Sequence, residues 1–403
     1  MATDSDPIDA PIPVPDVPGA DVPPGAGGLP PLSELTSHER RVVLASAAGD
    51  VALRTWVSSL LAVTAAPAVI ARSLFSQLHA DTGTEKGNLK FYAELAGEGD
   101  PQTSFPAPTD LPQVSSRPAG PLATWIARGT VENISFPSSF TAINPAMRER
   151  WRGWGRNNVA HAQHWRHDDG PRPTLCVIHG FMGSSYLANG RFFSMPWYYR
   201  AGYDVLLYTL PFHGWRAEKC SPFSGFGYFA GGLSGFAESM AQAVHDFRSV
   251  VEYLRHTGVE RIALTGISLG GYTSALVASV EDRIEAVIPN CPVVAPSTMF
   301  EQWFPANKLV SLGLQLSDIN REELDAGLAY HCPLNYRPLV PTDRRMIITG
   351  LADRMAPPGQ AEMLWHHWDH CALHWFPGSH VLHVSQLDYL RRMTDFLNEV
   401  MLN

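Results

Sequence analysis

The sequence predicts an α/β fold built on a doubly wound, mostly parallel sheet with helices on both faces. Short, continuous apolar runs alternate with helical segments along most of the 403 residues. Such runs are typical of strands buried on both faces, as in parallel sheets. A glycine-rich turn directly follows one of them, and 45% of the residues are hydrophobic, enough for a large core. Ligands of such folds bind at the carboxyl ends of the strands.

The strands of this sheet are expected in chain order. An antiparallel hairpin of residues 131–140 and 159–165 comes first. The apolar runs that follow are 173–180, 204–210, 261–265, 286–289, 345–349 and 372–376. A long helical pattern at 236–256 separates two of these runs, which indicates strand–helix–strand units.

The N-terminal part has a different composition. Residues 1–31 hold nine prolines and several acids, which predicts a disordered, solvated tail. Residues 32–122 are expected to form a helical extension that ends in a Pro-, Gly-, Ser- and Thr-rich linker at 96–122. The domain that contains the predicted sheet is then expected at 123–403.

Residues 55–71 contain no charged residue. This run is slightly short for a membrane span, and Pro67 is expected to break a helix there. We interpret the run as a helix docked on the body of the protein. The alternative is a substrate-access or membrane-surface helix, which would give the protein a peripheral membrane contact.

Charge and cysteine content narrow the possible partners. The formal net charge is −9, and seven acidic residues precede the first basic one, Arg40, so the rest of the chain is nearly neutral. A nucleic-acid-binding face would need clustered basic residues, so no nucleic-acid partner is expected. The five cysteines are widely spread without metal spacing, which predicts buried free thiols. With no secretory signal in view, we expect a cytoplasmic protein.

The turn Gly266-Ile267-Ser268-Leu269-Gly270 is the strongest chemical signal. A serine nucleophile needs a sharp strand-to-helix turn that exposes its hydroxyl, and the flanking glycines let the crowded backbones pass. The next backbone N–H, on Leu269, would lie at a helix N-terminus, facing developing negative charge. Ser268 is therefore the candidate nucleophile.

This stretch resembles the nucleophile elbow of the α/β-hydrolase family, and the resemblance covers the chain from about residue 125 onward. The family places an acid after a later strand and a histidine after the last one. Asp353 follows an apolar strand and a glycine and precedes a proline turn, and Gly378-Ser379-His380 follows the last apolar run. The resemblance implies that Asp353 orients His380, the general base, with His383 as the alternative.

The resemblance also implies an oxyanion hole. His179-Gly180-Phe181-Met182-Gly183 matches the family's His-Gly-x loop, so the N–H of Phe181, or alternatively of Met182, would join that of Leu269. His179 and His213 are interpreted as structural. No cofactor or metal is expected. His366 and His370 would share a helical face, but no third ligand at a suitable spacing accompanies them.

Residues 294–341 resemble a cap over an acyl site, rich in large apolar side chains. Met182, Phe212 and Trp303 are the candidate substrate-binding residues, and the aromatic stretch 221–236 could line the same pocket. The family resemblance implies a serine-dependent carboxylic ester hydrolase acting on small or lipid acyl esters. A thioesterase or amide hydrolase, and a non-catalytic binding or membrane-associated protein, are the alternatives. The sequence indicates no oligomeric state.

Overall fold

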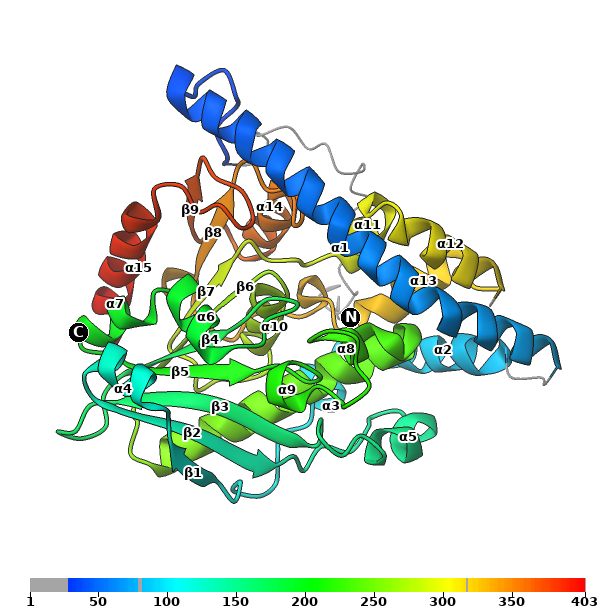
Figure 1. Ribbon diagram of the computed structural model, residues 1–403, viewed down its shortest axis with the longest axis horizontal. Helices are drawn as coiled ribbons and strands as arrows, with labels where there is room; N and C mark the ends of the chain where they lie inside the picture. The colour runs from blue at the N-terminus through cyan, green and yellow to red at the C-terminus, as the bar shows by residue number, and fades with distance from the viewer. Residues whose placement is uncertain (1–27, 79–81, 317, 403) are drawn as a thin grey trace, which may run out of the picture.

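The computed structural model describes residues 28–78, 82–316 and 318–402, and it contains one nine-stranded sheet (Figure 1). The strand order is β1-β2-β3-β5-β4-β6-β7-β8-β9. Strands β1 to β3 and β5 pair antiparallel, whereas all other neighbours are parallel. The strands are β1 Ser115–Pro118, β2 Thr130–Pro137, β3 Val159–Arg166, β4 Thr174–Ile178, β5 Asp204–Thr209, β6 Ile262–Ile267, β7 Ala286–Asn290, β8 Met346–Gly350 and β9 Ala372–Phe376. The predicted fold class and leading hairpin are confirmed.

Helices cover both faces of the sheet because the parallel strands are apolar on both sides. In β4, Cys176 and Ile178 belong to the larger core, whereas Leu175 and Val177 belong to a second core on the opposite face. Helices α9 and α10 and the cap pack into the larger core, and α7 and α15 pack into the second. The helices before the cap, apart from α1, are α2 Thr82–Glu98, α3 Pro101–Ser104, α4 Pro121–Ala127, α5 Arg148–Arg152, α6 Tyr186–Phe192, α7 Met195–Arg200, α8 Phe226–Ala230, α9 Gly232–His256 and α10 Leu269–Val277.

The expected cap is helical and lies between β7 and β8. It contains α11 Pro296–Gln302, α12 Ala306–Leu316, α13 Arg321–Ala329 and the short 3-10 helix Pro333–Asn335. The last two helices of the chain are α14 Pro358–His367, between β8 and β9, and α15 Gln386–Met401.

Two expectations for the N-terminal part need correction. Residues 115–118, expected in a linker, form β1 at the edge of the sheet; all four are exposed, so no buried-strand pattern marks them. Residues 28–31, expected in the tail, pack onto the body: Leu29 is buried against Leu351 and Ala352. The tail prediction for residues 1–27 lies outside the described part of the chain.

Helix α1, Ser37–Leu78, crosses one side of the molecule past α14 and the cap helices (Figure 1). It continues through Pro67, where a break was expected; a proline removes one backbone donor, and here the helix tolerates that loss. The Ser58 hydroxyl donates to the Trp303 carbonyl at 2.6 Å and accepts from Ala306 N–H at 2.9 Å. Docking on the body is thus confirmed for this part of the helix.

The run 55–71 leaves some apolar surface uncovered. Trp56 and Val63 are exposed, while the side chains of residues 65–71 lie outside the described residues. Within the described ranges, no helix combines the length and the apolar character that crossing a membrane requires. A peripheral membrane contact of this run therefore stays a prediction.

Candidate active site

Ser268 lies at the carboxyl end of β6, immediately before α10. Its backbone has φ 56° and ψ −116°, a region that a non-glycine residue occupies only under strain. Its N–H donates to the Asn290 carbonyl of β7 at 3.0 Å, which holds the turn against the neighbouring strand. The predicted sharp turn is therefore present, and the Ser268 side chain is only partly buried.

Glycines around the turn allow three backbone segments to meet. A Cβ on Gly270 would lie 2.1 Å from the Ile178 carbonyl oxygen of β4, and one on Gly266 would lie 2.4 Å from the Gly270 carbonyl oxygen. Real Cβ atoms do not approach backbone oxygens this closely. The two glycines thus let α10 start directly against β4.

Asp353 and His380 come together at the same edge of the sheet, after β8 and β9. His380 Nδ1 lies 2.6 Å from Asp353 Oδ2, and both side chains are buried. Asp353 Oδ1 accepts from the N–H groups of Met355 and Ala356 at 2.8 and 2.7 Å. The carboxylate is held on both oxygens, and it orients the imidazole.

His383, the alternative histidine, is engaged elsewhere. Its Nδ1 lies 2.7 Å from the Tyr389 hydroxyl and its Nε2 lies 3.1 Å from the His380 carbonyl oxygen. Burial lowers the pKa of His383 to about 4, so its ring is neutral at ordinary pH. His380, not His383, bonds Asp353.

Burial by itself would lower the pKa of His380. The charge of Asp353 and its hydrogen bond, with the charge of Asp50, outweigh burial and raise this pKa above the ordinary value of 6.5. Within the described ranges the Ser268 hydroxyl makes no hydrogen bond, to His380 or to another group. Catalytic hydrogen bonds are often long without substrate and shorten in the reactive complex.

The loop after β4 lies against Ser268. A Cβ on Gly180 would be 3.5 Å from the Ser268 Cβ. The loop turns tightly, with Gly183 N–H bonded to the Gly180 carbonyl at 3.1 Å and Met182 at φ 66°. Leu269 is the first residue of α10, so its N–H cannot bond within the helix. The loop and this N–H therefore lie next to the serine, and the oxyanion hole itself stays a prediction.

His179 braces this loop. Its Nδ1 lies 2.8 Å from the Gly180 carbonyl oxygen, and its Nε2 accepts from Leu210 N–H at 3.2 Å. Burial lowers its pKa to about 4, so the ring is neutral and Nδ1 carries the proton. His213 is also buried, and its Nδ1 lies 2.7 Å from the Pro211 carbonyl oxygen. Both contacts agree with structural roles.

The three candidate substrate-binding residues lie in different surroundings. Met182 is partly buried in the loop beside Ser268. Trp303 is partly buried at the end of α11, and its indole N–H donates to the Met355 carbonyl, two residues after Asp353, at 3.3 Å. Phe212 is buried in the core, edge-on to Trp151 and Trp154, so its ring cannot touch a substrate in this conformation.

Partly buried aromatic rings from the stretch 221–236 surround Phe181. Its ring makes edge contacts with Phe223 and Phe229, with centroids 6.0 and 5.2 Å apart. Phe229 also contacts Phe236 of α9 at 5.0 Å. This stretch thus adjoins the expected oxyanion loop.

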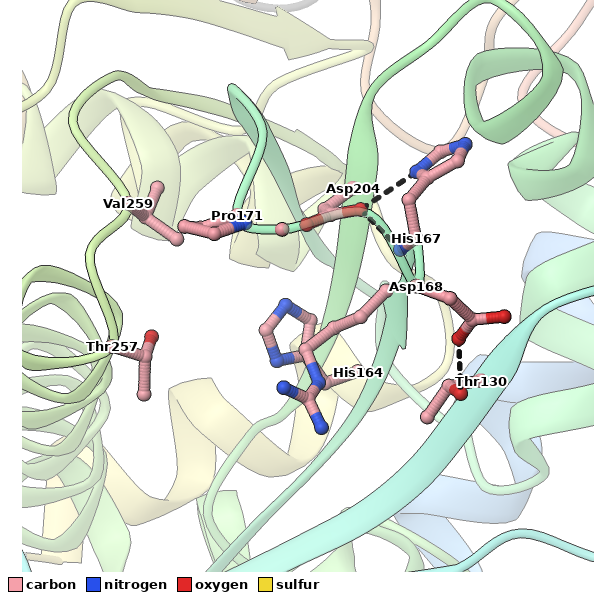
Figure 2. A pocket seen from close by; sticks show the side chains of 10 residues that line it. Thr130, His164, His167, Asp168, Pro171, Asp204, Thr257 and Val259 are labelled. Carbon is pink, nitrogen blue, oxygen red and sulfur yellow. Dashed lines mark hydrogen bonds and ion pairs between the residues drawn. The ribbon is translucent and has the colours of Figure 1, made fainter.

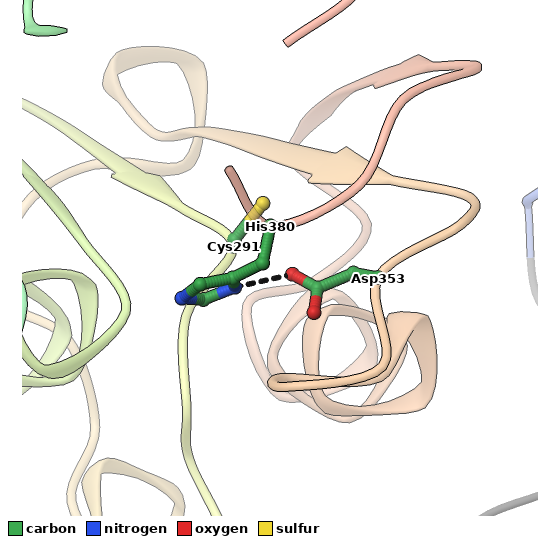
Figure 3. A group of neighbouring side chains, drawn as sticks. All are labelled: Cys291, Asp353 and His380. Carbon is green, nitrogen blue, oxygen red and sulfur yellow. Dashed lines mark hydrogen bonds and ion pairs between the residues drawn. The ribbon is translucent and has the colours of Figure 1, made fainter. Parts of the chain in front are cut away.

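Cys291 completes a group of three with Asp353 and His380 (Figure 3). Their potential ligand atoms lie within 4.8 Å of one another. Burial first, and then the charge of Asp353, raise the pKa of Cys291 well above its usual range, so its thiol lies protonated beside the hydrogen-bonded Asp–His pair.

His366 and His370, considered above as metal ligands, do contact each other. His366 Nδ1 lies 3.1 Å from His370 Nε2. His366 is in the last turn of α14, whereas His370 follows the helix with φ 58°. In the part of the chain that the structure describes, no third ligand joins this pair.

Sequence reasoning overlooked Asp50 of α1. Its Oδ2 accepts from the N–H groups of His380 and Arg354 at 2.9 and 3.0 Å. A signal for it exists in the sequence. Asp50 shares the helical spacing of the buried residues Val43, Ser46 and Val57, so it is an acid within a stripe that faces the body.

Figure 2 shows a surface pocket of about 270 Å³. Its lining residues lie at the end of the strands opposite to Ser268. His164 and Arg166 at the end of β3 line it, together with Asp204 at the start of β5. Asp204 is bonded to His167 at 2.8 Å. Because Ser268 lies at the carboxyl end of β6, this pocket is separate from the candidate active site.

Comparisons with known proteins agree with this architecture. Residues 173–320 match the family model of the alpha/beta hydrolase fold. Two proteins of Mycobacterium tuberculosis, the uncharacterized proteins MT2702 and Rv2627c, are each 30% identical over 300 residues, covering 72% of this chain and 68% of each relative.

Solved structures are similar in fold. Acetyl xylan esterase 1 from Thermoanaerobacterium sp. JW/SL YS485 superposes with a TM-score of 0.55 at 14% identity, over 77% of this chain and 93% of that one. The acetyl xylan esterase from Paenibacillus sp. R4 gives 0.51 at 15% identity, over 78% and 94%. With the sheet order, the strained serine turn and the family match, the chain belongs to the α/β-hydrolase fold superfamily.

Proposed function

We propose that the protein is a serine-dependent carboxylic ester hydrolase. The observation that carries this proposal is the Asp353–His380 pair, bonded at 2.6 Å, at the same sheet edge as the strained Ser268 turn. A binding protein would not need a strained serine and an oriented imidazole at one edge of the sheet. Ser268 is the nucleophile, His380 the base and Asp353 the orienting acid.

The reaction is acyl transfer to water. Ser268 Oγ attacks the ester carbonyl carbon while its proton passes to His380 Nε2, the nitrogen that does not face Asp353. The N–H groups of Leu269 and Phe181 stabilise the negative oxygen of the tetrahedral intermediate. His380 then protonates the leaving alcohol as the C–O bond breaks. Water, deprotonated by the same imidazole, hydrolyses the acyl-enzyme and restores Ser268.

Acyl esters are the proposed substrates because apolar rings adjoin the expected oxyanion loop. Phe181, Phe223 and Phe229 present partly buried aromatic surface there. Such surface favours an acyl chain over a charged group. Matched p-nitrophenyl esters and acyl-CoA thioesters of equal chain length compare ester with thioester preference directly.

The nucleophile is tested with Ser268→Ala. We expect loss of p-nitrophenyl acetate hydrolysis and of covalent labelling by a fluorophosphonate probe, because no other hydroxyl occupies the elbow. Ser311→Ala, on the exposed side of cap helix α12, is the matched serine control. It should keep both the hydrolysis and the fluorophosphonate labelling. Labelling that persists in Ser268→Ala would contradict the assignment.

A further inference from the structure

Helix α1 places charged side chains on the face that it buries. Asp50 is only 2% exposed, and Arg54, one helical turn further on, is half-buried. Other contacts also hold this segment. Leu35, just before α1, and Val43 pack against Leu351 and Ala352 in the loop that precedes Asp353, and Ser58 makes two hydrogen bonds to the cap. Docking by such neutral contacts does not require a charge, so a buried carboxylate requires a separate explanation.

Asp50 joins the two loops that carry the proposed acid and base. Its Oδ2 accepts from His380 N–H at 2.9 Å and from Arg354 N–H at 3.0 Å. Arg354 directly follows Asp353, and its carbonyl accepts from Arg54 at 2.9 Å. A single oxygen atom of α1 therefore fixes the backbone on both sides of the Asp353–His380 hydrogen bond.

We propose that Asp50 is a positioning residue, through which the N-terminal helix holds His380 and Asp353 in register for catalysis. This inference rests on the proposed function. The mechanism is geometric: displacement of a catalytic group by about 1 Å can cost a factor of about 10² in rate. Asp50 contacts neither Ser268 nor the reacting atoms, and it acts through the histidine backbone.

The location of Asp50 has an electrostatic cost that supports this role. Burial first, and then the nearby charge of Asp353, raise the pKa of Asp50, while the N–H groups of His380 and Arg354 partly compensate. The titratable groups near His380 are Asp353, Asp50, the neutral Cys291 thiol and the neutral His383 ring, and Arg54 and Arg354 are the nearby cations. Two N–H groups donate to the Asp50 carboxylate, and its charge acts on His380 together with that of Asp353.

Three full-length variants separate positioning from docking. Asp50→Ala removes both backbone contacts, whereas Asp50→Asn keeps an amide oxygen that can accept them and removes only the charge. Ser58→Ala is the matched control, because Ser58 also makes two hydrogen bonds from α1 to the body, to Trp303 and Ala306. Thermal unfolding of each variant shows whether it is folded before its kinetics are compared.

The readouts are kcat and KM for p-nitrophenyl acetate and the pH profile. We expect Asp50→Ala to lower kcat by about 10²-fold with little change in KM. Asp50→Asn should keep kcat within a few-fold of the wild-type value. Its acid limb should move to lower pH, because one negative charge that favours the protonated imidazole is gone. Ser58→Ala should keep kcat within about two-fold, since misplacement of His380 is what costs rate.

Equal losses of kcat in Asp50→Ala and Ser58→Ala would overturn the inference, since docking alone would then explain the helix. A folded Asp50→Asn as slow as Asp50→Ala, or with an unmoved acid limb, would also overturn it. If Asp50→Ala does not fold, Asp50→Asn decides through its pH profile, and an unmoved acid limb overturns the inference. Failure of the proposed function is recognised separately, as wild-type protein whose Ser268 is not labelled by the fluorophosphonate.

Discussion

Asp353 Oδ2 lies 2.6 Å from His380 Nδ1, and this contact joins the loops that follow the last two strands of the sheet. The other oxygen of Asp353 is occupied by two backbone N–H groups, so only Oδ2 faces the imidazole. Nδ1 therefore carries the proton, and Nε2 is left to accept one. This arrangement fixes the tautomer that a general base needs.

Replacement of that carboxylate tests its orienting role. Asp353→Asn should lower kcat for p-nitrophenyl acetate by about 10³–10⁴-fold, because an amide can stabilise the wrong tautomer of His380. Asp388→Asn, an exposed aspartate on α15, is the control and should be unaffected. A variant that keeps more than about a tenth of wild-type kcat would contradict the role of Asp353.

The pH profile should have an acid limb set by His380. Its pKa is raised above 6.5 by Asp353 and Asp50, and only the neutral imidazole accepts the serine proton. kcat/KM should therefore rise with pH and level off above that pKa. His383, with a pKa of about 4, is neutral throughout. A limb at a pKa below 6.5 in the folded wild-type protein would contradict this assignment.

The tight start of α10 makes Gly270 intolerant of a side chain. A Cβ there would lie 2.1 Å from the Ile178 carbonyl oxygen and 2.7 Å from that of His179. We expect Gly270→Ala to lower the free energy of unfolding, measured by urea denaturation, by about 3 kcal/mol or more. Backbone strands on both sides prevent relaxation.

A second glycine supplies the control for this measurement. In the first turn of α9, a Cβ on Gly235 would meet no atom within 4 Å. Gly235→Ala should therefore raise the free energy of unfolding by roughly 0.5–1 kcal/mol through helix propensity. If both variants behave alike, close backbone packing does not explain the glycine at 270.

Phe229 is expected to limit acyl chain length. Its ring packs on Phe181 with centroids 5.2 Å apart, so Phe229→Ala opens space beside the expected oxyanion loop. In Phe229→Ala, the ratio of kcat/KM for p-nitrophenyl octanoate to kcat/KM for p-nitrophenyl acetate should rise by about ten-fold. The reason is that each extra buried methylene contributes about 0.8 kcal/mol. Trp215→Ala, at an exposed ring, should leave the ratio unchanged. An unchanged ratio in Phe229→Ala would place the acyl chain elsewhere.

Local sequence was sufficient for eight of the nine strands and for three site candidates. The strand around Val287 could be recognised because both faces are buried, which leaves an uninterrupted apolar run. Ser268, Asp353 and His380 each follow a strand in a short, distinctive context. Parallel strands carry such residues to one edge, so their proximity could be expected before any coordinates were known.

Other features have no local signature. β1 is a four-residue exposed edge strand that is defined only by its pairing with β2. Phe212 follows a strand as a pocket residue would, yet its ring points between Trp151 and Trp154. The local pattern tells on which element a side chain lies, and packing decides which way it points.

By itself the sequence determined the order of strands and helices, the serine turn and the acid and histidine that follow later strands, because each depends on residues close together in the chain. The tertiary structure alone decided which histidine bonds the acid, and that a helix some 330 residues earlier holds that histidine by its backbone. Contacts over such separations depend on how whole elements pack. Every residue except proline has a backbone N–H group, so residue type does not show which of these groups binds a distant side chain.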